Sequence, residues 1–203
     1  SPTDQNSSLS NTAVPESVEM SEDSEIFENP TGESFEITTT HWLNERPIGD
    51  GEGPVTDEML LEHQSVAAGR NWIQFGGDYS NNRHSPIEQL SVANIDELEF
   101  EWSIPSGTLG QFSVSPIVYD GIMYVTTSYN RLMAVNARTG QLYWRYDHQQ
   151  PEDLRICCGP ANRGASIHGD KIFMATLDAK ILAFDRMSGE ILWESEIIDY
   201  SRG

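Results

Sequence analysis

Short apolar segments separated by turn residues run through the second half of the chain, and two stretches of them resemble each other closely. Residues 121–144 and residues 170–193 share the pattern Ala-x-(Asn/Asp)-x-x-(Thr/Ser)-Gly-x-x-x-Trp, which begins at Ala134 and again 49 positions later at Ala183. The segments are rich in Ile, Val, Tyr, Phe and Thr, the residues enriched in β-strands. The pattern therefore predicts two successive copies of one all-β unit.

Each copy carries turn signals where its strands must reverse direction. Asp-Gly at 120–121 and Gly-Asp at 169–170 suit tight hairpins, and Thr-Gly at 139–140 and Ser-Gly at 188–189 suit the next turn. A repeat of about 50 residues with about four strands is typical of one β-propeller blade. We predict about two propeller blades, the alternative being a coincidental pair of β-meanders.

The tryptophan that ends each copy, Trp144 or Trp193, is expected to pack between neighbouring blades. Before the repeat, Thr56 can cap a short helix that starts with acidic residues at Asp57. Residues 98–104 alternate apolar and polar positions, which predicts a half-buried strand.

Charge is distributed unevenly along the chain. Lys and Arg number 12 against 32 Asp and Glu, with a pI near 4.3. Without a basic surface, nucleic acid and anionic membranes are excluded as partners. Nine of the acids and no Lys or Arg lie in the first 40 residues. We therefore expect residues 1–52 to be an acidic low-complexity extension, disordered or lying on other structure, and residues 53–203 to form the propeller portion.

No stretch approaches the roughly 18 apolar residues of a membrane span, so no transmembrane segment is predicted. The chain opens Ser-Pro-Thr-Asp, without the basic and apolar start of a signal peptide. It is therefore either cytosolic or already separated from its leader. The five histidines show no metal-ligand spacing and are expected at the surface or in turns; they are residues 41, 63, 84, 148 and 168.

The only two cysteines are neighbours, Cys157 and Cys158. Adjacent Cα atoms lie about 3.8 Å apart, whereas an ordinary disulfide separates them by about 4.4–6.8 Å. A bond between these two would close a strained ring, of the kind found at functional sites. The alternative is a reduced pair that acts as two small apolar side chains, and the pair alone does not decide between them.

The sequence from about Gly53 to Gly203 resembles the N-terminal part of a pyrroloquinoline quinone (PQQ)-dependent alcohol dehydrogenase of the methanol/ethanol dehydrogenase type. The matching stretches are residues 54–57, 72–86 and 115–127, the two Trp-ended repeats, and Cys157-Cys158-x-x-x-Asn162-Arg163-Gly164. The resemblance implies an eight-bladed propeller with the quinone at its axis. A cofactor-free propeller scaffold of the bacterial envelope, of the outer-membrane assembly type, is the alternative, although it has no reason to keep the cysteine motif.

The resemblance also implies roles for individual residues. Cys157 and Cys158 would form a vicinal disulfide over one face of the quinone, and Arg163 would reach the quinone carbonyl oxygens. Ser113 stands where the family often has a glutamate that bonds the cofactor, and its hydroxyl could still do so without charge. For Arg163 the alternative is a loop arginine paired to an acidic residue.

By the same resemblance, the catalytic aspartate and the ligands of a Ca²⁺ or lanthanide ion would lie beyond Gly203, so we expect no catalytic or metal-binding residue in this chain. Two blades leave an open sheet edge. We therefore predict that the chain is inactive alone, being a proteolytic fragment, a partial polypeptide or one subunit of a two-chain enzyme. The expected partners are the remainder of the propeller, an alcohol substrate and a cytochrome c-type electron acceptor, and the expected location is the periplasm.

Overall fold

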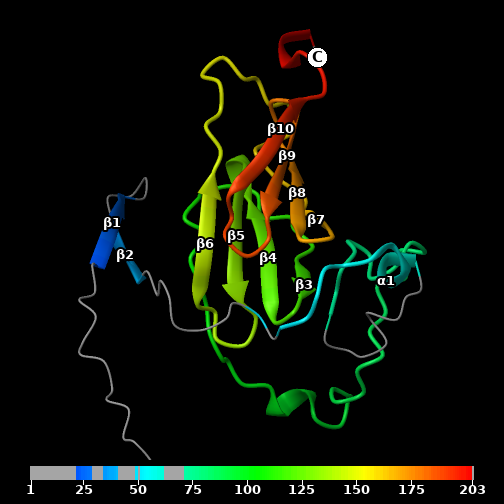
Figure 1. The fold of residues 1–203 in the computed structure, drawn as a ribbon. Helices are drawn as coiled ribbons and strands as arrows, with labels where there is room; N and C mark the ends of the chain where they lie inside the picture. Colours follow the sequence, from blue (N-terminus) through cyan, green and yellow to red (C-terminus); the bar gives the residue numbers. More distant parts are fainter. Residues whose placement is uncertain (1–21, 29–33, 41–48, 50, 62–70, 203) are drawn as a thin grey trace, which may run out of the picture.

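Two four-stranded antiparallel sheets form the body of the molecule, and a separate two-stranded hairpin precedes them (Figure 1). The computed structural model describes residues 22–28, 34–40, 49, 51–61 and 71–202. The all-β fold and the two consecutive meanders confirm the fold class that the repeat predicted.

The first sheet, called blade 1, contains four strands in sequential order. They are β3 (Ile117–Tyr119), β4 (Ile122–Thr127), β5 (Arg131–Asn136) and β6 (Leu142–Asp147). Each strand pairs antiparallel with the next, so the sheet is a simple meander. These strands occupy the first predicted copy and its lead-in.

The second sheet, called blade 2, repeats the same meander. Its strands are β7 (Ser166–His168), β8 (Lys171–Ala175), β9 (Lys180–Asp185) and β10 (Ile191–Glu196). They also pair sequentially, from β7 to β10. The sequence repeat is therefore a structural repeat.

The predicted turns are present and use the backbone conformations that their residues favour. Asp120 and Gly121 have φ angles of 58° and 72°, as a two-residue hairpin turn with a left-handed backbone at both positions requires. Gly169 has φ 58° in the matching turn of blade 2. Gly140 and Gly189, with φ of 72° and 74°, end the turns between the last two strands of each blade.

The core lies between the blades and within them. Tyr119, Tyr124, Leu132, Ile172 and Phe184 are fully buried or nearly so. The first three come from blade 1 and the last two from blade 2, and all belong to one continuous apolar cluster. The two sheets therefore share a single core.

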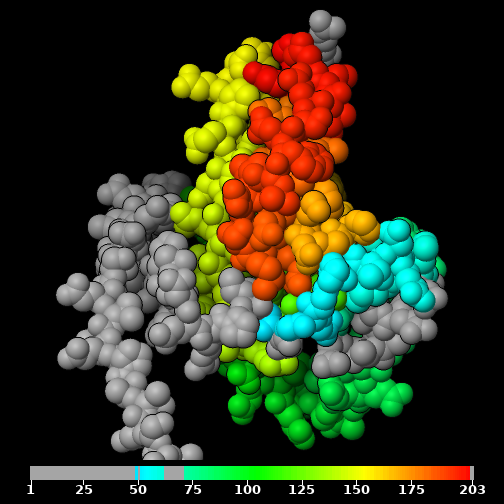
Figure 2. Space-filling view, in the orientation of Figure 1, coloured from blue at the N-terminus to red at the C-terminus, as the bar shows by residue number. Residues whose placement is uncertain are grey.

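Trp144, which ends blade 1, packs against blade 2, as the sequence predicted. Its ring stacks on Phe184 with centroids 6.2 Å apart and an interplanar angle of 20°. Its indole Nε1 donates a hydrogen bond to the Arg186 carbonyl oxygen at 3.1 Å. Trp193 ends blade 2 in the same way but is 44% exposed, and Figure 2 shows β10 on the open surface of the molecule.

An N-terminal segment, residues 51–61, crosses both blades at the end that carries the β3–β4 and β7–β8 turns. It includes α1 (Asp57–Leu61), whose Met59 N–H donates to the Thr56 side-chain oxygen at 3.2 Å, as expected of a cap. Val55 forms an antiparallel bridge with Gly169 of blade 2. In Figure 2 this segment lies directly against the second blade.

The strand predicted for residues 98–104 does not form, and that prediction was wrong. These residues have no strand partner within the part of the chain that the structure describes, and η1 (Ile95–Glu97) is a single turn before them. Leu98 and Phe100 are 58% and 81% exposed. Apolar and polar residues do alternate in this segment, but a strand also needs a neighbouring strand to which its backbone can hydrogen-bond.

The acidic N-terminal extension contains a hairpin that its composition did not predict. Strands β1 (Glu22–Glu28) and β2 (Ser34–Thr40) pair antiparallel, with Glu22 opposite Thr40. Figure 1 labels these two strands β1 and β2. The expectation that the extension forms no packed domain of its own stays a prediction.

Candidate functional site

The segment between the blades carries three of the four predicted site residues, Cys157, Cys158 and Arg163, and it rises above the strand ends after β6 (Figure 1). Residues 157–164 lead directly into the first strand of blade 2, just as Ser113 lies shortly before the first strand of blade 1. The two lead-in segments are joined, because the Ser115 N–H donates to the Arg163 carbonyl oxygen at 3.4 Å. The structure therefore brings Ser113 and Arg163 onto neighbouring backbone segments.

A second contact confirms that the two segments lie close together. An added Cβ at Gly159 would lie 3.1 Å from the Gln111 side-chain oxygen, and one at Gly164 would lie 3.2 Å from the Ser115 carbonyl oxygen. Gly159 and Gly164 also have φ angles of 88° and 139°, in the region that L side chains rarely adopt. Both glycines therefore suit the close approach of the two segments.

Cys157 and Cys158 are exposed, and the structure holds them as free thiols with their Sγ atoms 2.8 Å apart. The pKa of Cys158 is raised, first by its hydrogen bond with Cys157, while the nearby positive charge of Arg163 acts to lower it. The two thiols and the guanidinium are therefore neighbours. The disulfide that the family resemblance implies stays a prediction.

Arg163 is exposed, and its side chain makes no hydrogen bond or ion pair with any of the described residues. The alternative interpretation, a loop arginine neutralised by an acidic neighbour, therefore finds no such neighbour there. Ser113 is likewise exposed, and its hydroxyl has no partner within residues 71–202. Both side chains are available to a ligand.

These residues suit a quinone. A quinone presents carbonyl oxygens that accept hydrogen bonds, and Arg163 offers a guanidinium with no other partner in the described structure. Ser113 offers a hydroxyl donor. The adjacent thiols of Cys157 and Cys158 offer a compact polarizable surface beside them.

Asn162 anchors this loop, a role that the sequence analysis did not assign. It is buried, and its Nδ2 donates to the Asn130 Oδ1 and to the Ala175 carbonyl oxygen, both at 2.9 Å. Its Oδ1 accepts from the Gly164 N–H at 3.2 Å. The signal in the sequence was an amide residue directly before Arg163, but its partners lie in two different blades.

The turn η2 (Ser128–Asn130) completes the support beneath the loop. Tyr129 and Asn130 have φ angles of 63° and 59°, so two consecutive residues other than glycine are left-handed. The Tyr129 N–H donates to the Pro160 carbonyl oxygen at 2.9 Å. Such conformations cost of order 1–3 kcal/mol each and cluster at functional sites.

A buried hydrogen-bonded pair of side chains, His148 and Asp178, lies at the same end of the blades. His148 Nε2 is 2.8 Å from Asp178 Oδ1, and the two side chains are 4% and 2% exposed. The Tyr146 hydroxyl contacts the other ring nitrogen of His148 at 2.9 Å. His148 lies in the connection just after β6, as a turn residue would, but its side chain is buried and not at the surface, because it bonds to Asp178, 30 positions away in blade 2.

Burial acts to raise the pKa of Asp178, but hydrogen bonds from Thr176 and His148 outweigh it and leave the pKa below its usual value. A carboxylate that accepts such bonds is stabilised in its charged form. The pair therefore links blade 1 to blade 2 near the loop that carries the cysteines.

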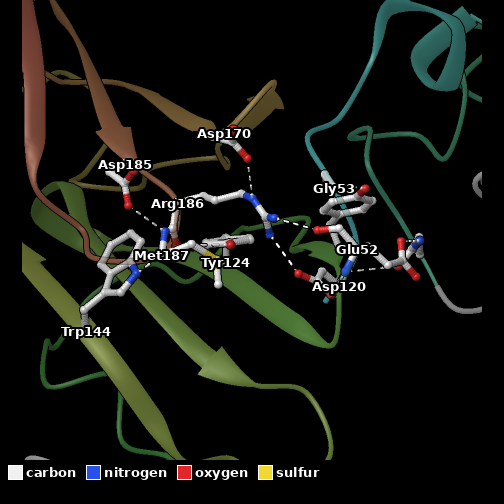
Figure 3. A network of polar contacts seen from close by, with 11 residues as sticks. Glu52, Gly53, Asp120, Tyr124, Trp144, Asp170, Asp185, Arg186 and Met187 are labelled. Carbon is white, nitrogen blue, oxygen red and sulfur yellow. Dashed lines mark hydrogen bonds and ion pairs between the residues drawn. The ribbon is translucent and has the colours of Figure 1, made fainter. Parts of the chain in front are cut away.

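Arg186 joins the blades at the opposite end (Figure 3). Its guanidinium contacts Asp120 at 3.0 Å and Asp170 at 3.3 Å, and donates to the Glu52 carbonyl oxygen at 3.0 Å. Its own carbonyl oxygen accepts from the Tyr124 hydroxyl at 3.2 Å. This network connects both blades and the N-terminal segment, so it has a structural role.

The described residues contain no group of three or more His, Cys, Asp or Glu side chains that could hold a metal ion. Within those same residues, no helix has the length and apolar composition needed to cross a bilayer.

The two blades and their shared core define the chain as part of a β-propeller. A family model described as the β-propeller domain of glucose, ethanol and alcohol dehydrogenases, abbreviated PQQ, matches residues 72–197. The chain belongs to this family of PQQ-dependent alcohol dehydrogenases.

Individual relatives agree with that assignment. The quinoprotein ethanol dehydrogenase of Pseudomonas aeruginosa is 41% identical over 134 residues, which are 64% of this chain and 21% of that protein. The quinoprotein alcohol dehydrogenase PedH of Pseudomonas putida is 40% identical over 157 residues, covering 76% of this chain and 26% of that protein. The chain thus spans about a fifth to a quarter of the length of these relatives.

Solved structures show the same fold. The quinohemoprotein alcohol dehydrogenase from Comamonas testosteroni aligns with a TM-score of 0.60 and 31% identity, over 65% of this chain and 20% of that one. A europium-containing methanol dehydrogenase aligns with the same TM-score and identity, over 64% of this chain and 23% of that one. The structure of BamB from Moraxella catarrhalis reaches a TM-score of only 0.31, which carries no argument for the scaffold alternative.

Proposed function

We propose that this chain supplies one wall of the quinone site in a PQQ-dependent dehydrogenase that oxidises an alcohol. One observation carries the proposal. Arg163, unpaired among the described residues, stands beside the adjacent cysteines Cys157 and Cys158 on a loop anchored to two blades. Family membership supplies the cofactor class to which that loop is suited.

Each residue of the wall has a definable task. Arg163 donates hydrogen bonds to the quinone oxygens and meets the negative charge that develops there. Ser113 donates a neutral hydrogen bond from the neighbouring segment. Cys157 and Cys158, joined as a vicinal disulfide, cover one face and exclude water. The quinone, when bound, accepts the hydride from the alcohol, while the protein supplies position and field.

The remaining parts of the proposed enzyme come from the rest of the propeller. They are the aspartate base, the ligands of a Ca²⁺ or lanthanide ion, and the surface that passes electrons to a cytochrome c-type acceptor. One structural relative is a europium-containing methanol dehydrogenase. We place the enzyme in the periplasm, where a disulfide is stable. The 203-residue chain alone is expected neither to oxidise alcohol nor to hold quinone tightly.

The test uses the complete propeller, reconstituted with PQQ and the metal ion and assayed for alcohol-dependent reduction of a dye. Replacing Arg163 by Ala is expected to lower turnover by about 10²–10³-fold, the usual effect of removing one donor to developing charge. Replacing Arg83 by Ala is the matched control, because that exposed arginine stacks on the Phe75 ring at 4.6 Å and lies outside the loop.

Two outcomes would contradict the proposal. If the complete protein binds no PQQ, the quinoprotein function fails and the non-enzymatic scaffold becomes the better description. If PQQ binds and alcohol is oxidised, but the Arg163 and Arg83 variants behave alike, the assignment of Arg163 fails while the enzyme class stands.

A further inference from the structure

The Asn162 carboxamide makes hydrogen bonds to three separate parts of the molecule. Nδ2 donates to Asn130 at the start of blade 1 strand β5 and to the Ala175 carbonyl oxygen at the end of blade 2 strand β8. Oδ1 accepts the Gly164 N–H of its own loop. Both polar atoms of its side chain are therefore used for anchoring.

The backbone of Asn162 is held as well. Its carbonyl oxygen accepts a hydrogen bond from the Thr126 hydroxyl at 3.5 Å, and the next carbonyl along the chain, that of Arg163, accepts from the Ser115 N–H. Arg163 therefore extends from a backbone that is fixed on both sides. Its exposed side chain, in contrast, has no anchor of its own in the described structure.

Asn130, the partner in blade 1, is held in an uncommon conformation. It is fully buried with a φ of 59°, a conformation that asparagine tolerates better than most residues other than glycine. Its Oδ1 accepts from Asn162, while its own Nδ2 has no hydrogen-bond partner among the described residues. Leaving a buried donor unpaired costs about 1–3 kcal/mol, which the hydrogen bond to Asn162 offsets in part.

We infer that Asn162 is a positioning residue for the proposed quinone site. Its carboxamide fixes the loop between the two blades so that Arg163 and the cysteine pair face the quinone in one arrangement. The inference rests on the proposed function. It assigns the geometry of the wall to a buried inter-blade amide that does not itself contact the cofactor.

The test measures the affinity of the complete apoprotein for PQQ by fluorescence quenching, together with the thermal unfolding midpoint. Asn162→Ala is expected to weaken PQQ binding about 10-fold or more, by analogy with the loss of metal affinity when a residue that orients a metal ligand is removed. Tyr124→Phe is the control, because it removes one buried bond between the blades at the opposite end, to the Arg186 carbonyl oxygen. It should lower the midpoint while leaving PQQ affinity unchanged.

A second variant keeps the inference testable if Asn162→Ala does not fold. Asn130→Gly removes the blade 1 partner and suits the left-handed backbone, so it should also weaken PQQ binding, by a smaller factor than Asn162→Ala. In the double variant the two effects should be less than additive, since both changes break the same bond.

The outcomes separate this inference from the function on which it rests. Normal PQQ affinity in Asn162→Ala or in Asn130→Gly, with a wild type that binds PQQ, overturns the inference alone. The inference is also overturned if Asn162→Ala and Tyr124→Phe have the same thermal unfolding midpoint and lose PQQ affinity to the same extent. Asn162 would then have only a structural role. A wild type that binds no PQQ overturns the proposed function and this inference together.

Discussion

The Trp144 ring covers Gly189 so closely that no side chain fits there. An ideal Cβ built on Gly189 would lie 2.5 Å from Trp144 Cδ2. Trp102 lies over Gly140 in the same way, 2.5 Å from the corresponding Cβ position. The tryptophan before each blade therefore packs on the glycine in the last turn of that blade, and Trp193 is the next tryptophan in the series.

Replacing Gly189 by Ala should lower the free energy of unfolding by about 2–4 kcal/mol. The new methyl group would overlap the indole, and alanine would have to adopt a φ of 74°. Gly169→Ala is the matched control, because its φ is 58° but nothing lies within 4 Å of its Cβ position. Denaturant titration of the complete propeller measures both. Equal losses in the two variants would show that backbone strain, and not the indole, decides the effect.

Replacing Trp193 by Ala should destabilise the complete propeller by about 3 kcal/mol or more, the usual cost of removing a buried tryptophan. Trp144 is covered by blade 2, whereas Trp193 is 44% exposed here and contacts Phe173 of its own blade. In the complete propeller we expect the next blade to cover Trp193 as blade 2 covers Trp144. Glu196→Gln on the same strand is the control. If thermal unfolding is no more affected by Trp193→Ala than by Glu196→Gln, no further blade covers this tryptophan.

Cys157 and Cys158 should be oxidised to one another in freshly purified native protein. The chain contains no other cysteine, and the two Sγ atoms already lie 2.8 Å apart. Intact-mass measurement without reductant should show the loss of two hydrogen atoms, and thiol titration of the denatured protein should find no free thiol. Two titratable thiols would contradict the disulfide and leave the cysteine pair as a reduced wall of the site.

Asp178 should make the stability of the propeller sensitive to acid. Its pKa in the folded state is lowered, so it binds a proton less readily in the folded than in the unfolded chain. Its contribution is therefore present above the usual carboxyl pKa of about 3.9 and is lost as the pH falls through the lower folded value. Asp178→Asn should be less stable than wild type at pH 6, and the difference should shrink below about pH 4.

Urea unfolding of both proteins across pH 2.5–7 measures this difference. Asp153→Asn is the control, because that aspartate is exposed and its side chain bonds only to the Tyr200 hydroxyl among the described residues. A difference between wild type and Asp178→Asn that does not vary with pH would contradict the assignment of acid sensitivity to Asp178.

Elements whose signals are local in sequence could be predicted. The turn at residues 120–121 contains the residue types that a left-handed backbone selects, and Thr56 is a typical helix cap. The strand predicted at residues 98–104 failed because alternation specifies a face and not a partner. His148 was expected at the surface or in a turn, and the burial of its side chain was missed because its partner, Asp178, is distant in sequence.

By itself, the sequence determined the all-β class, the two blades, their turns and the adjacency of the cysteines, since propensities and repeats act over short distances along the chain. Only the tertiary structure decided that Asn162 joins Asn130 to Ala175, that Arg163 has no acidic partner in the described residues, and that Trp144 covers Gly189. These relationships arise where one blade packs against the next. They depend on hydrogen-bond geometry and close contact between residues tens of positions apart, which no local pattern specifies.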